Sequence, residues 1–299
     1  MVSTQTVPVE HMTAVTVRPK KRRLSWTQRF SLWGSLGYLA AFFVIPVGAL
    51  VLNSFQTVDG WTLTNYAQVL SDGYYLGIFW ETVRIGFIST TITILLSYPV
   101  AAFISRLSNR GVALVMVFVI LPYFTNTVVR TFAWIVILGR EGALNSFLIA
   151  AGIIPEPLQM LYNELGVMVG LVYVFLPLAI LIQFAVMRGI DTNLLRAAET
   201  MGASKVRAFF KVYLPLSLPG TIAAALLVFI ECVGAYITPA LMGGQGNTMV
   251  AQIIERQVRM GLDFGTAAAV VVILGVVVSG IYVLYDRITG MTKLFEDNS

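Results

Sequence analysis

Apolar residues gather in six long runs along the 299-residue chain, and polar segments separate these runs. An α-helix needs about 20 apolar residues to cross the hydrocarbon core of a membrane. The third run is the least regular, because Pro122 lies inside it and Arg130 lies near its outer end. The pattern predicts an all-α integral membrane protein with six transmembrane helices, near residues 34–54, 82–104, 111–132, 165–187, 217–241 and 264–285.

The distribution of basic residues predicts the orientation of these helices. Cytoplasmic segments of membrane proteins carry an excess of Lys and Arg. Most of the 20 Lys and Arg residues fall on one side of the membrane if the N-terminus is cytoplasmic. We therefore expect both termini in the cytoplasm, with a tail and a short interfacial helix (Leu24–Trp33) in residues 1–33, a transmembrane domain at 34–286 with a cytoplasmic loop at about 188–216, and a second tail at 287–299.

The composition agrees with a membrane protein and limits the chemistry open to it. Hydrophobic residues make up 57% of the chain, charged residues 12%, and the mean hydropathy is +0.81, which excludes a soluble globular domain. The single Cys232 and single His11 exclude an intrachain disulfide and a Cys/His metal site. The chain has no GxxxxGK[ST] phosphate loop for ATP hydrolysis. Its basic clusters border apolar runs, which indicates lipid contact rather than nucleic-acid binding.

The segment Leu194–Gly220 is the polar stretch with the most distinctive pattern, and it reads LLRAAETMGASKVRAFFKVYLPLSLPG. Residues 194–201 favour a helix, and Gly202 is the residue type that ends one in a left-handed conformation. Ser204 can cap a second helix over residues 205–213. Pro215 marks the expected end of that second helix. The pattern predicts two short helices with a tight turn between them.

This segment resembles the signature loop of the membrane subunits of bacterial ABC importers. That loop reads Glu-Ala-Ala, three residues, Gly, nine residues, Ile, one residue, Leu-Pro. Arg196 stands here in place of the Glu, and Val212 in place of the Ile. The resemblance implies that the segment binds a separate ATPase subunit, through Arg196, Ala197, Ala198, Glu199, Gly202, Ala203, Ser204, Leu214 and Pro215.

A looser similarity covers most of the chain, from about residue 34 to 286. The runs Leu121–Asn145 and Val233–Gly244 resemble the permeases of the spermidine/putrescine importer group. Ala235 stands where many of those proteins have an acidic residue, so opines and phosphonates remain alternatives to a polyamine. The resemblance implies a type I importer fold in the bacterial inner membrane, with two ATPase subunits that bind ATP and Mg²⁺, a second permease subunit that is a paralogue, and an external solute-binding protein as partners.

Glu231 and Arg84 are the ionisable residues placed well inside predicted spans. Charged side chains in a membrane usually face a wet cavity or pair with one another. We consider two hypotheses for Glu231, a place on the path of a cationic solute and a structural ion pair with Arg84. The other candidates for the path are Tyr123, Asn126, Tyr173 and Tyr236. A stand-alone secondary transporter or channel for a small cation is the alternative function, although it would need more ionisable groups inside the spans, and a membrane enzyme would need a catalytic cluster.

Overall fold

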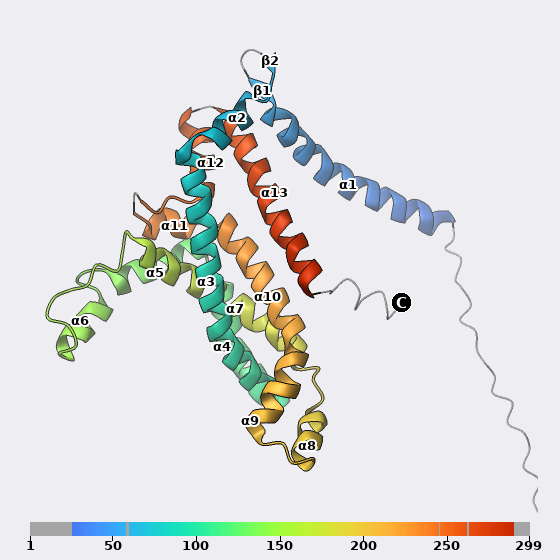
Figure 1. The fold of residues 1–299 in the computed structure, drawn as a ribbon, viewed down its shortest axis with the longest axis vertical. Coiled ribbons are helices and arrows are strands. Elements are labelled where there is room, and N and C mark those ends of the chain that lie inside the picture. The colour runs from blue at the N-terminus through green and yellow to red at the C-terminus, as the bar shows by residue number, and fades with distance from the viewer. Residues whose placement is uncertain (1–25, 58–59, 245, 262, 290–299) are drawn as a thin grey trace, which may run out of the picture. The chain divides into compact units, whose positions relative to one another are not determined.

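The computed structural model describes residues 26–57, 60–244, 246–261 and 263–289, which are mostly helical (Figure 1). The α-helices are α1 (Trp26–Ser54), α2 (Thr64–Ser71), α3 (Gly73–Ser105), α4 (Asn109–Tyr123), α5 (Thr127–Leu138), α6 (Ala143–Ala150), α7 (Glu164–Met187), α8 (Thr192–Thr200), α9 (Lys205–Ala208), α10 (Leu214–Gly234), α11 (Ile237–Met242), α12 (Val250–Arg256) and α13 (Phe264–Thr289). Two π-helical turns, η1 (Phe209–Tyr213) and η2 (Gln257–Gly261), and an antiparallel pair of two-residue strands, β1 (Gln56–Thr57) and β2 (Gly60–Trp61), complete the described elements.

The prediction of six helices long enough to span a membrane is confirmed. These are residues 33–54, 73–105, 127–150, 164–187, 205–234 and 264–284, judged by length and composition. The second of them begins nine residues earlier than expected, at Gly73 rather than at residue 82. The segment between the first two predicted spans, residues 55–81, is therefore partly helical.

The predicted third span, residues 111–132, is wrong. α4 ends at Tyr123, and α5 begins at Thr127. Between them, the Asn126 side chain accepts a hydrogen bond of 2.8 Å from the Val128 amide, which caps the start of α5. With 15 residues, α4 is only about 22 Å long, shorter than the hydrocarbon core of about 30 Å. The spanning candidate in this part of the chain, judged by length and composition, is residues 127–150, which comprise α5, α6 and the turn between them.

The chain divides into two compact units, residues 1–49 and 50–299. In the first unit, α1 begins at Trp26 and runs without a break past Trp33, so the segment expected as a separate interfacial helix forms its first turns. Its side chains from Trp33 to Ala49 are almost all exposed, among them Phe42 and Phe43. A helix that is apolar on every side is typical of a membrane span. The predicted basic tail lies outside the described residues.

The second unit is built around α3, α7 and α10, which make its most extensive contacts. Their buried side chains form one cluster that includes Ile85, Leu171 and Val228. Glycine lets the helices approach closely, because a Cβ atom at Gly220 of α10 would lie 2.5 Å from the Val186 Cβ of α7. The core of the unit is therefore formed by three closely packed helices, and at some positions, such as Gly220, it has no room for a larger side chain.

The segment Leu194–Gly220 follows the prediction at its first break and departs from it at the second. Gly202 has a φ of +89° and ends α8, as expected. Pro215 does not end the second helix, because α9, η1 and α10 follow one another without interruption. In η1 the Leu214 amide reaches back five residues to the Phe209 carbonyl. Pro215 then lies in the first turn of α10, where a missing N–H is tolerated.

The predicted fifth span, residues 217–241, also ends too late. α10 stops at Gly234, because Ala235 takes an extended conformation with φ −67° and ψ 129°. The chain resumes as the short helix α11 at Ile237. Non-helical backbone at membrane depth is tolerated where it lines a cavity or packs against protein, so this break directs attention to the space around residues 235 and 236.

Candidate functional site

A cavity of about 520 Å³ opens beside the break between α10 and α11, and we call it the Glu231 cavity. Its wall combines residues of α5, α7, α10 and α11, namely Thr127, Val174, Phe175, Ile230, Glu231, Gly234, Ala235, Tyr236, Ile237 and Thr238. Glu231 supplies the only carboxylate among these residues. Within the described part of the chain no Lys or Arg lies within ion-pair distance of that carboxylate.

The electrostatics of the Glu231 cavity favour a cation. The carbonyl end of α10 at Gly234 lies on the wall, and the C-terminus of a helix carries a partial negative charge. The Glu231 side chain is exposed and adds a full negative charge. Tyr236, which is also exposed, places an aromatic ring on the same wall, and such a ring attracts cations to its face.

Arg130 of α5 holds together the wall opposite α10, and the sequence singled it out only as an irregularity. It is 7% exposed. Its Nη2 donates to the Thr127 Oγ1 at 3.2 Å, and its Nη1 donates to the Val174 carbonyl at 3.4 Å. Val174 lies just before Pro177, whose missing N–H disturbs the hydrogen bonds of α7. Arg130 therefore connects α5 to the proline-containing turn of α7 behind two residues that line the cavity.

The structure brings together some of the residues predicted for the solute path and separates others. Glu231 and Tyr236 share the cavity, and Asn126 precedes the lining residue Thr127 and caps its helix. Tyr173 does not line the cavity, and its ring packs edge-on against Trp134 with centroids 5.3 Å apart. Tyr123 packs in the same manner against Phe124, at 6.0 Å. These two aromatic contacts are packing contacts within the chain.

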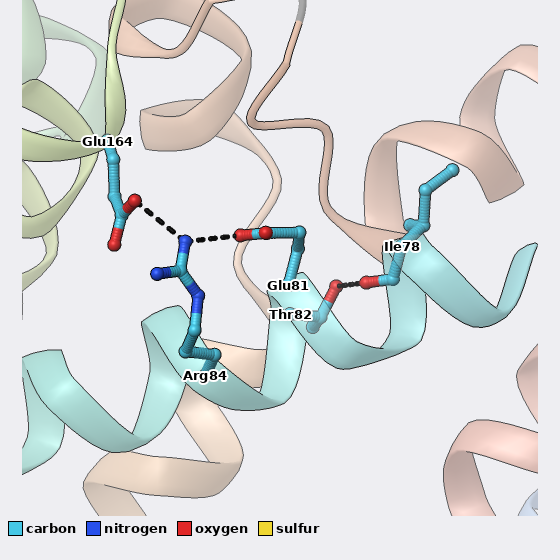
Figure 2. Close-up of polar contacts among 5 residues, drawn as sticks. All are labelled: Ile78, Glu81, Thr82, Arg84 and Glu164. Atoms are coloured by element: carbon cyan, nitrogen blue, oxygen red, sulfur yellow. Dashed lines mark hydrogen bonds and ion pairs between the residues drawn. The ribbon is translucent and has the colours of Figure 1, made fainter. Parts of the chain in front are cut away.

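The hypothesis of an ion pair between Glu231 and Arg84 is wrong. The Nη2 of Arg84 lies 2.7 Å from carboxylate oxygens of both Glu81 and Glu164, as Figure 2 shows. Glu164 stands in the first turn of α7, where a negative charge is favourable. Because α3 begins at Gly73, Arg84 is only about three turns from its start and not at the middle of a span. The cluster joins α3 to the beginning of α7.

The predicted ATPase-binding residues that belong to α8 lie on two opposite faces of this helix. Positions 194, 197, 198 and 201 share one face of a helix, and positions 192, 195, 196 and 199 share the other. The first face carries the two alanines and Met201, which is 84% exposed. The second face turns toward the ends of α3 and α7 and lines a cavity with Arg196 and Glu199. Arg196, the departure from the signature, therefore does not share a face with the alanines.

The turn after α8 is fixed by its own residues. Gly202 supplies the left-handed conformation, and the Ser204 side chain accepts a hydrogen bond of 3.3 Å from the Arg207 amide, as a cap of α9. Leu214 and Pro215 stand in the first turn of α10. Figure 1 shows α8 and α9 beside one end of α10, and the Glu231 cavity lies at the other end. The 21 residues of α10 thus separate the two sites by about 30 Å.

These features define the membrane-spanning permease component of an ABC importer, a class that moves solute and does not itself carry out catalysis. Residues 73–291 match the family described as binding-protein-dependent transport system inner membrane component, and the chain belongs to that family. It is an inner-membrane protein with the type I permease fold.

Two of the similar proteins belong to spermidine/putrescine transport systems. The spermidine/putrescine transport system permease protein PotB of Escherichia coli (strain K12) is 30% identical, over 84% of this chain and 94% of that protein. PotB of Haemophilus influenzae is 34% identical, over 82% of this chain and 88% of that protein. Among solved structures, a chain from a bacterial ABC transporter involved in the import of the acidic polysaccharide alginate has a TM-score of 0.75 at 15% identity, over 89% of this chain and 96% of that one. The last similarity concerns the fold alone.

Proposed function

We propose that this chain is a permease subunit of an ATP-driven importer of polyamines such as spermidine and putrescine. It forms half of the translocation path, and a second permease, a paralogue, forms the other half. A solute-binding protein delivers the polyamine from outside. Two ATPase subunits, which hold ATP and Mg²⁺, bind the segment Leu194–Gly220. The similarity to PotB over more than four fifths of the chain carries this proposal.

The Glu231 cavity supports a polyamine as the solute. Polyamines carry several ammonium groups and no negative charge. A carboxylate without an ion-pair partner, the carbonyl end of α10 and the ring of Tyr236 all attract an ammonium group. At about 4 Å and an effective dielectric constant of about 20, one carboxylate and one ammonium attract each other by about 4 kcal/mol before desolvation costs. The cavity is thus suited to one ammonium group at a time.

The two faces of α8 support separate roles for the residues that lie near the proposed ATPase-binding site. Between Leu194 and Met201, the alanine face has little side-chain bulk, because Ala197 is exposed and Ala198 is partly exposed, so another protein can approach the backbone closely there. Since α9, η1 and α10 are continuous, a force applied at the turn around Gly202 can be transmitted along α10. The far end of α10 is the wall of the Glu231 cavity. ATP-driven movement of the ATPase subunits would in this way change the shape of the cavity.

Purification and reconstitution test the proposal. The tagged chain, isolated in mild detergent from its native membrane, should bring with it an ATPase and a second permease. Liposomes that contain this complex should take up labelled spermidine or putrescine when the solute-binding protein is outside and ATP inside. If 2-aminoethylphosphonate inhibits uptake and polyamines do not, the substrate is a phosphonate and not a polyamine. Uptake by the chain alone, without the ATPase, would favour a secondary transporter or channel.

A further inference from the structure

A second polar cavity, of about 430 Å³, lies between α8 and the ends of α3 and α7, and we call it the Arg196 cavity. Three of its lining residues are cations, Arg106, Arg196 and Lys205, and one is a carboxylate, Glu199. Among the described residues, none of the three cations has a carboxylate within ion-pair distance. The cavity therefore holds an excess of positive charge that the described residues do not neutralise.

The carbonyl end of α3 beside this cavity would by itself repel an anion, but Arg188 donates a hydrogen bond to it. The C-terminus of a helix carries a partial negative charge, and α3 and α7 both end here. The Nη1 of Arg188 donates hydrogen bonds of 2.8 Å to the carbonyls of Ser105 and Leu107. Its Nη2 donates to the Asn109 side chain. Since Arg188 occupies the carbonyls at the end of α3, Arg106 is left to face the cavity.

An aromatic floor holds one of the cations in place. The guanidinium of Arg106 lies 5.1 Å above the ring of Tyr213. Tyr213 is itself buried, stacks on Phe209 and lies 3.1 Å from Ser105 through its hydroxyl oxygen. A cation stacked on a ring that cannot move has a defined position. The cavity thus has one cation held over a buried ring and two more, Arg196 from α8 and Lys205 from the start of α9.

We propose that the Arg196 cavity binds a phosphate-bearing anion, with the headgroup of an anionic phospholipid as its source. Phosphate oxygens accept hydrogen bonds from Arg and Lys, and basic pockets between helices near a membrane surface bind acidic headgroups. The ends of two helices that are candidate membrane spans, α3 and α7, form one side of this cavity. This binding site does not depend on the identity of the transported solute. Its effect on ATP hydrolysis rests on the proposed role of α8.

The structure also accounts for the departure from the importer signature at this position. Arg196 occupies the place of a glutamate, and that place faces the Arg196 cavity and not the exposed alanine face. With a glutamate there, the cavity would hold two cations and two carboxylates and would not attract an anion. The exchange of one residue thus produces the anion site without changing the alanine face of α8.

Lipid retention by the purified permease–ATPase complex tests this proposal. We expect native mass spectrometry to find phosphatidylglycerol on the wild-type complex from nanodiscs of phosphatidylcholine and phosphatidylglycerol. The double variant Arg106→Gln/Lys205→Gln should retain less phosphatidylglycerol by a factor of about ten or more, because each cation contributes to the attraction of the headgroup. The matched control Arg110→Gln/Lys211→Gln removes two cations at the same end of the molecule, outside the cavity, and should retain phosphatidylglycerol as the wild type does.

A second arm separates the two sources of phosphate. In pure phosphatidylcholine nanodiscs, inorganic phosphate is titrated while ATP hydrolysis and complex stability are followed. Stabilisation by phosphate that Arg106→Gln/Lys205→Gln abolishes would support the site with a soluble anion as its ligand. Equal lipid retention by both double variants, together with no response to phosphate, would overturn the proposal. Loss of the ATPase from every preparation would contradict the proposed function instead, and lipid retention would then be measured on the permease alone, so that the two failures stay distinct.

Discussion

The Glu231 cavity yields a prediction for a single, nearly isosteric substitution. Glu231→Gln keeps the shape of the side chain and removes its charge. A hydrogen bond to a charged group contributes about 1.5–3 kcal/mol, which corresponds to a factor of roughly 10 to 150 in binding. Glu231 is exposed to the cavity, so solvent screens its interaction, and we expect the lower end of that range. The ratio of the maximal rate of spermidine uptake to its KM should fall by about tenfold.

The assay is ATP-driven uptake of labelled spermidine into liposomes that contain the full complex, over a range of concentrations of loaded solute-binding protein. Glu231→Asp, which keeps the charge on a shorter side chain, should recover part of the loss. Glu141→Gln is the matched control, because Glu141 is an exposed carboxylate between α5 and α6 that does not line the cavity. Wild-type uptake by Glu231→Gln in a normally assembled complex would refute the role of this carboxylate.

Three further predictions concern the framework of the permease. Gly202→Trp forces a side chain onto a φ of +89° and should prevent co-purification of the ATPase while membrane insertion is normal; full transport would contradict the role of α8. Gly220→Leu places a side chain against Val186 and should cost about 1–3 kcal/mol or more of stability, seen as a lower unfolding temperature in detergent. Arg84→Gln leaves the carboxylates of Glu81 and Glu164 without a cation and should also lower that temperature, with partial recovery in the double variant that adds Glu164→Gln.

Most of the membrane architecture could be predicted from the sequence, because the length of an apolar run determines whether it can cross a membrane. The third span could not be placed correctly. Hydropathy alone does not register that Asn126 caps a new helix inside an apolar run. The end of the helix predicted over residues 205–213 was misjudged for a similar reason. A proline usually ends a helix, and only the geometry of η1 shows that the chain continues past Pro215 as a helix.

The candidate site was predictable where a residue type is informative by itself. An acidic residue inside an apolar run identified Glu231, and its neighbour Tyr236 shares the cavity. Pairings across long stretches of chain were not predictable. The partner of Arg84 on α7 is 80 residues away, and no local pattern connects the two. Arg130 looked like an irregularity of a span until its hydrogen bond to the Val174 carbonyl related it to the turn before Pro177.

The position of Arg196 changes how the importer signature is interpreted. In the sequence, Arg196 is one of the residues expected to bind the ATPase, although it stands in place of the signature glutamate. On α8, however, this position lies about 100° around the helix from Ala197 and about 160° from Ala198, and its side chain lines the Arg196 cavity. The signature therefore contains two surfaces that can change independently. In the proposed role of α8, the alanine face is constrained by close approach of the ATPase, whereas the face that lines the Arg196 cavity is constrained by the charge of that cavity, which the single exchange at position 196 changes from balanced to positive.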